Sequence, residues 1–104
     1  MPKGYIIARV SVDDADSYAE YARGAFKAMG IYGARILARG GRSEALEGEA
    51  RQRNVILEFD SYEQAKKYFN SPEYQAARKH RVNGSKGEFV LVEGFDGEQP
   101  GGVT

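Results

Sequence analysis

The sequence predicts one α+β domain in which four strands form an antiparallel sheet and the helices pack on one of its faces. Three observations support this class. The chain has 104 residues, enough for a single domain with a modest core. Strand and helix patterns follow the order strand, helix, strand, strand, helix, strand, which is the split βαβ arrangement. The apolar fraction of 41% is ordinary for a globular protein.

The first strand and first helix are predicted from alternation and capping. Residues 5–12 (YIIARVSV) alternate between two faces, as a strand does. The pair Asp13–Asp14 offers an N-cap, and apolar residues then recur at spacings of three and four, which predicts a helix ending at Gly30. Gly24 inside this helix indicates close packing against a neighbour or a local loss of regularity.

Two further strands frame a charged segment. The second strand is predicted over residues 34–39, before the pair Gly40–Gly41. The mixed charges of residues 42–53 indicate a solvent-exposed excursion, in which residues 44–46 could form a short strand. The third strand is predicted over residues 54–59 (NVILEF).

Two helix starts then follow each other closely. Ser61 lies three residues before Gln64, a capping-box pattern, and this helix ends at Asn70. The run Ser71–Pro72–Glu73 predicts a separate short helix from Pro72 to about His80, before the last strand. The remaining predictions are a polar loop at 81–87, a strand at 88–95, a domain spanning 1–95 and a flexible tail at 96–104.

Composition excludes several kinds of chemistry. The chain has no Cys and one His, which excludes disulfides, thiolate ligands, Cys nucleophiles and multi-imidazole metal sites, so we expect no metal and no cofactor. Fifteen basic residues balance fifteen acidic ones, which gives no field for a nucleic acid. No apolar stretch is long enough for a signal peptide or a membrane span, so we expect a cytoplasmic location and no membrane partner.

The predicted sheet has a second face that no helix covers. Ile7, Leu37 and alternate residues of the later strands cannot all point at the helices. Strand parity leaves open whether Val55 or Ile56, and whether Val90 or Leu91, faces outward. Several hundred square ångströms of apolar surface in water would be unusual for a monomer. We therefore predict a homodimer joined through the sheets.

Charges inside strands are the first candidates for a functional site. Arg39 and Glu58 lie within predicted strands, where a charge tends to be paired or to face a cavity. One interpretation is a structural ion pair or a rim charge. The other places both in a cleft between sheet and helices, where Arg39 binds a substrate carboxylate or enolate while Glu58 or His80 moves a proton. Arg9 is a weaker substrate-binding candidate of the same sort.

His80 and three tyrosines each allow two interpretations. His80 titrates near neutrality and could act as a general base, but the run RKHR that contains it is typical of a solvent-exposed helix end. Tyr21, Tyr68 and Tyr74 could direct their hydroxyls into one substrate-binding pocket, or could simply pack in the core with a hydroxyl at its edge.

Several short motifs resemble one known family. The run SPEYQ at 71–75, together with LARGG at 37–41, EFDS at 58–61 and VEG at 92–94, looks like the family catalogued as domain of unknown function 1330. The resemblance covers roughly Pro2 to Phe95. It implies a ferredoxin-like protomer in a dimeric α/β barrel, a superfamily that also includes cofactor-free monooxygenases, isomerases and stress-response proteins. It implies no established reaction.

Two functions therefore remain open. One is a homodimer that binds a small organic ligand, a carboxylate or an aromatic compound, in a cleft of each protomer, with cofactor-free acid–base or monooxygenase-like chemistry. The other is a non-catalytic dimeric binding or stress-associated module, in which the same residues only fix the structure.

Overall fold

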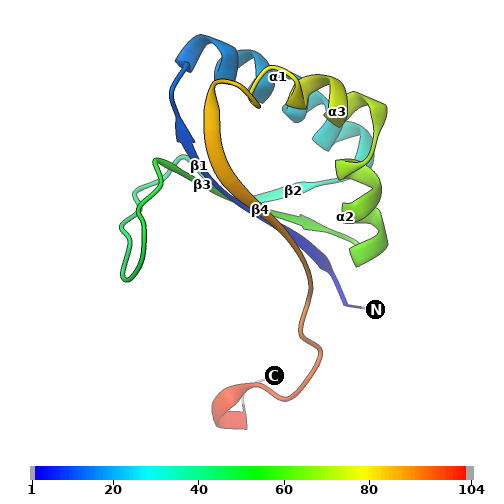
Figure 1. Ribbon diagram of the computed structural model, residues 1–104. Coiled ribbons are helices and arrows are strands. Elements are labelled where there is room, and N and C mark those ends of the chain that lie inside the picture. The colour runs from blue at the N-terminus through cyan, green and yellow to red at the C-terminus, as the bar shows by residue number, and fades with distance from the viewer. Residues whose placement is uncertain (1, 103–104) are drawn as a thin grey trace.

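Four antiparallel strands and three helices make up the fold, which the computed structural model describes for residues 2–102 (Figure 1). The strand order in the sheet is β2-β3-β1-β4. This arrangement confirms the predicted α+β class. In chain order the elements are β1 (Gly4–Val12), α1 (Ala15–Tyr32), β2 (Arg35–Arg39), β3 (Arg53–Phe59), α2 (Tyr62–Phe69), α3 (Pro72–Arg78), β4 (Ser85–Glu93) and a 3₁₀ turn, η1 (Pro100–Gly102).

The helices cover one face of the sheet, and the core lies between the two layers (Figure 1). Ile6 and Val10 of β1 point toward the helices, as the predicted alternation requires. Their partners across the ladder are Leu57 and Arg53, so these residues share the helix-facing side. The same registers resolve the parity question, because Val55 and Leu91 face the helices while Ile56 and Val90 face outward.

The helix starts follow the predicted caps. Asp14, Ser61 and Ser71 each accept a hydrogen bond from a backbone N–H in the first turn of the helix that follows. The predicted end of α1 is wrong, because the helix continues through Gly30 to Tyr32. Gly33 ends it instead: its φ of 76° is left-handed, and its N–H bonds the helix at Met29.

Two strand predictions need correction, those for the last strand and for residues 44–46. The last strand begins at Ser85, which pairs with Val12, and ends at Glu93. Because β4 is an edge strand, a polar start is tolerated there, although the same composition predicts a loop. No strand forms at residues 44–46. β2 is short and carries a bulge between Ile36 and Ala38.

Two segments extend from the body of the domain (Figure 1). Segment 40–52 joins β2 to β3 and is mostly exposed, as predicted for residues 42–53. Two arginines depart from that prediction: Arg53 belongs to β3 and lines a cavity, and the Arg51 side chain is buried. After β4 the chain leaves the sheet and reaches η1. The predicted flexibility of this tail stays a prediction, and its last two residues, 103–104, lie outside the described part of the chain.

Candidate functional site

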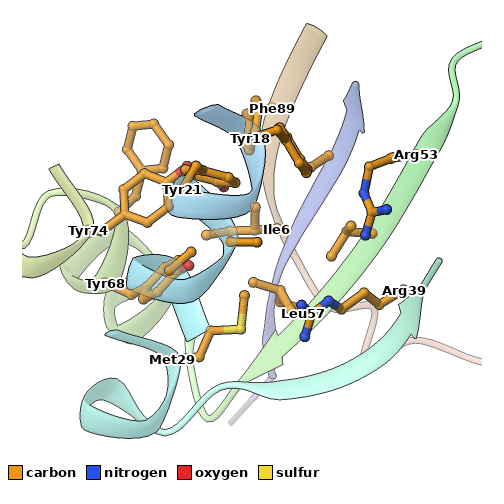
Figure 2. Close-up of a pocket in the computed structure, with 15 residues that line it drawn as sticks. Ile6, Tyr18, Tyr21, Met29, Arg39, Arg53, Leu57, Tyr68, Tyr74 and Phe89 are labelled. Atoms are coloured by element: carbon orange, nitrogen blue, oxygen red, sulfur yellow. The ribbon is translucent and has the colours of Figure 1, made fainter. Parts of the chain in front are cut away.

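A cavity lies between the sheet and the helices, lined by 15 residues drawn from both layers (Figure 2). Its walls are mainly aliphatic and aromatic, for example Ile6, Met29 and Phe89. The centre of a water molecule can move through about 40 Å³ of it, whereas one ordered water needs at least roughly 10–15 Å³. The cavity therefore has room for a small molecule.

Four tyrosines line the helix side of the cavity: Tyr18, Tyr21, Tyr68 and Tyr74 (Figure 2). Tyr21, Tyr68 and Tyr74 are all buried, and the hydroxyl oxygens of Tyr21 and Tyr74 lie 3.0 Å apart. The Tyr74 ring packs against the Tyr68 ring with their centroids 4.9 Å apart. The structure thus brings together the three tyrosines that the sequence proposed for one pocket. Burial raises the pKa of Tyr21 and of Tyr68, so both hydroxyls stay protonated at neutral pH.

Arg81 does not line the cavity but bonds one of these tyrosines, although the sequence placed it in a polar loop. Its side chain is buried, and its Nη2 donates to the Tyr74 hydroxyl at 3.2 Å. Its guanidinium lies 4.0 Å from the ring centroid of Phe89 and 5.2 Å from that of Tyr21. The run RKHR did not indicate this burial, because such a cationic run is typical of a solvent-exposed helix end. The three residues before Arg81 are indeed exposed.

Two arginines form the strand side of the cavity (Figure 2). Arg39 of β2 and Arg53 of β3 both project from the helix-facing side of the sheet. Their guanidinium groups stack over aromatic rings, Arg39 over Phe26 at 5.5 Å and Arg53 over Tyr18 at 5.3 Å. Within residues 2–102, no carboxylate lies within salt-bridge distance of either group. The Nε of Arg53 is also buried without a hydrogen-bond partner in that range.

Glu58 lies on the opposite, outer face and does not share the cavity with Arg39. The bulge in β2 explains the separation: Arg35 pairs with Glu58 on the outer face, whereas Arg39, beyond the bulge, pairs with Val55 on the inner face. Arg35 Nε donates to the Glu58 carboxylate at 2.8 Å, and the Tyr5 hydroxyl donates to it at 3.0 Å. The bonds from Arg35 and then Tyr5 lower the pKa of Glu58.

Arg9 and His80 also lie outside the cavity. Arg9 is on the outer face, where it donates to the backbone oxygen of Glu49 and lies 3.9 Å from the Glu88 carboxylate. His80 is exposed in the turn after α3, with its backbone N–H bonded to Ala77, which agrees with the helix-end interpretation. Of the predicted site residues, the cavity therefore holds Arg39 and the three tyrosines.

Sequence comparison identifies the family. The profile of DUF1330, a domain of unknown function, matches residues 3–95. The chain belongs to the DUF1330 family. The match spans β1 to β4, so it covers both layers that enclose the cavity. No curated protein matches this DUF1330 chain.

Solved structures share the fold of this DUF1330 domain. A protein of unknown function from Rhodopseudomonas palustris aligns with a TM-score of 0.71 at 19% identity, over 92% of this chain and 85% of that one. A dimeric protein of unknown function with a ferredoxin-like fold from Bacteroides fragilis gives 0.55 at 18% identity, over 88% and 95%. SnoaB, a cofactor-independent oxygenase from Streptomyces nogalater, gives 0.55 at 14% identity, over 95% and 96%. These likenesses confirm the ferredoxin-like fold.

None of the helices within residues 2–102 combines the length and the apolar character that a membrane span requires. In the same range, no three His, Asp or Glu side chains cluster in a way that could hold a metal ion.

Proposed function

We propose that this protein binds a small organic carboxylate with an apolar or aromatic body in the cavity between sheet and helices. The observation that carries the proposal is a contrast among arginines. On the outer face, Arg35 lies 2.8 Å from Glu58 and Arg51 lies 2.6 Å from Glu88. At the cavity, Arg39 and Arg53 have no such carboxylate among the described residues.

A carboxylate ligand supplies what these two groups lack. A guanidinium donates two parallel hydrogen bonds to a carboxylate, and such bonds are stronger where water is partly excluded. The buried, unbonded Nε of Arg53 is one donor that the described chain leaves free. The apolar wall formed by residues such as Ile6 and Leu57 suits an aliphatic or aromatic body.

Binding is favoured over acid–base catalysis by the composition of the cavity wall. Its 15 residues include no carboxylate and no imidazole, and both predicted proton-transfer residues, Glu58 and His80, lie elsewhere. The proposed function is therefore that of a ligand-binding module. Its cytoplasmic location stays a prediction from the sequence.

The test is calorimetric titration with benzoate and with benzamide, its uncharged analogue. We expect benzoate to bind the wild type and benzamide to bind much more weakly. Arg39→Gln removes one charge-assisted interaction, so it should weaken benzoate binding by about tenfold. Arg78→Gln, which alters an exposed arginine outside the cavity, is the matched control and should bind as the wild type does. Unchanged benzoate affinity in Arg39→Gln would contradict the proposal.

We also propose that two copies associate through the outer face of the sheet. This face has no helix on it, and it exposes Ile7, Val90 and Val92 by 37%, 52% and 40%. An apolar surface of this kind is typical of an interface. Two solved structures of similar fold, from Bacteroides fragilis and Thermobifida fusca, are described as dimeric, which supports the proposal.

A further inference from the structure

The tyrosine hydroxyls on the helix side of the cavity, together with Arg81, which is bonded to Tyr74 but does not itself line the cavity, have more donors than acceptors. Arg81 donates to the Tyr74 hydroxyl, and a guanidinium can only donate. Tyr21 and Tyr74 share one hydrogen bond, in which either hydroxyl can be the donor. Of the two hydroxyl hydrogens, one is used in that bond. The other has no acceptor within the described chain, whichever way the bond runs.

Tyr68 adds a second free donor. Its side chain is only 2% exposed and lines the same cavity. No hydrogen bond joins its hydroxyl to another described residue, although its ring packs against that of Tyr74. Because burial raises the pKa of Tyr21 and Tyr68, these hydroxyls are donors rather than tyrosinate acceptors.

The charge of Arg81 is also uncompensated. The side chain is 9% exposed, yet no Asp or Glu in residues 2–102 lies within 4 Å of it. The contacts of its guanidinium are two aromatic rings and one tyrosine hydroxyl. Its Nε is buried and has no partner in the same range. A buried cation without an anion is unfavourable. A water molecule could accept the spare hydroxyl hydrogen, but it would leave this charge unbalanced.

We propose that the Tyr21 and Tyr74 hydroxyls, with Arg81 hydrogen-bonded to Tyr74, form a second anion subsite, which binds an ionised hydroxyl of the same ligand whose carboxylate Arg39 and Arg53 bind. This inference rests on the proposed function and narrows the ligand to small carboxylates that carry a phenol or an enol. Figure 2 shows the tyrosines on the helix side and the two arginines on the strand side, so one ligand would lie between them. Donors that favour the anionic oxygen lower the pKa of the ligand hydroxyl.

The probes for this subsite are 4-hydroxybenzoate and benzoate, which differ by one hydroxyl. We expect the wild type to bind 4-hydroxybenzoate about tenfold more tightly than benzoate at neutral pH. The ultraviolet spectrum of the bound 4-hydroxybenzoate should be that of the phenolate, although the free compound carries a neutral hydroxyl at this pH.

Tyr74→Phe keeps the ring and removes the hydroxyl that links Tyr21 to Arg81. This variant should bind both probes equally. Tyr21→Phe removes the other hydroxyl of the pair and should show the same loss, which keeps the test decisive if Tyr74→Phe does not fold. Tyr62→Phe removes a hydroxyl outside the cavity and should retain the preference of the wild type.

The outcomes separate the two proposals. Arg39-dependent benzoate binding without a preference for 4-hydroxybenzoate, or with a neutral bound hydroxyl, would overturn the second subsite and leave the proposed function intact. A preference that survives in both tyrosine variants would also overturn it. Failure of both probes to bind the wild type would overturn both proposals.

Discussion

At the scale of single residues, the Glu58 carboxylate stabilises the fold to a degree that depends on pH. Hydrogen bonds from Arg35 and Tyr5 lower its pKa. A lowered carboxyl pKa stabilises the fold above the unfolded-state pKa, and this stabilisation is lost as pH falls through the folded-state value. We expect Glu58→Gln to lower the Tm at neutral pH, with a difference from wild type that shrinks below the ordinary glutamate pKa of 4.5. Thermal melts at about pH 7 and about pH 3 measure this.

Glu47→Gln is the control for that series, because Glu47 is exposed and makes no salt bridge within the described residues. Its Tm should follow the wild type at both pH values. An equal loss of Tm for Glu58→Gln at both pH values would contradict the assigned pairing with Arg35.

Individual site residues differed in how well the sequence revealed them. Arg39 was identifiable because a charge inside a strand is unusual, and the tyrosines were identifiable from their positions on or beside helical stripes. Arg81 was not, because its burial depends on Phe89 and Tyr74, which reach it only through the tertiary fold. The separation of Arg39 from Glu58 depends on one bulge in β2, which no sequence pattern marked.

At the scale of elements, α1 and α3 cross so closely that only glycine fits at one point. A Cβ at Gly24 would lie 2.7 Å from the Cβ of Ala77, which confirms the predicted close packing. Overpacking of this kind costs about 1–3 kcal/mol, whereas alanine improves helix propensity by about 1 kcal/mol. We therefore expect Gly24→Ala to lower the free energy of unfolding by about 1 kcal/mol.

Gly30 provides the matched comparison in the same helix. A Cβ there would meet nothing within 4 Å, so Gly30→Ala gains propensity without a clash and should raise the Tm by a few degrees. Denaturant unfolding measures the change in free energy for Gly24→Ala, and a thermal melt measures the change in Tm for Gly30→Ala. A stabilised Gly24→Ala would mean that α1 and α3 can separate without loss.

Element order was predictable because capping residues and periodicity act locally. Asp14, Ser61 and Ser71 marked three helix starts, and each hydrogen-bonds as its position predicts. Element ends were less predictable. α1 passes Gly30 because a helix ends where the backbone turns left-handed, and here Gly33 makes that turn. The start of β4 was missed because pairing with β1 outweighs the polar composition of residues 85–87.

At the scale of the whole molecule, the shape fits a protein that associates. The radius of gyration is 14.7 Å, whereas a compact domain of this length has about 13 Å. The radius of gyration exceeds that of a compact domain because residues 40–52 and the C-terminal segment extend away from the sheet (Figure 1). The uncovered outer face adds apolar surface without a partner in the chain.

We expect light scattering at micromolar concentration to give the mass of two chains. Val90→Glu places a charge on the outer face, on the edge strand β4, so it should shift the mass to that of one chain. Val82→Glu makes the same substitution at an exposed valine outside the sheet and should leave the dimer intact. A wild type that behaves as a single chain under these conditions would refute association through the sheet.

The central claim is that the cavity binds a carboxylate through Arg39 and Arg53. A crystal structure of the wild type grown with saturating benzoate tests it most directly. The account predicts the ring between the tyrosines and the sheet, with the carboxylate within hydrogen-bond distance of both guanidinium groups. A cavity left empty of benzoate, or a carboxylate directed away from both arginines, would contradict it.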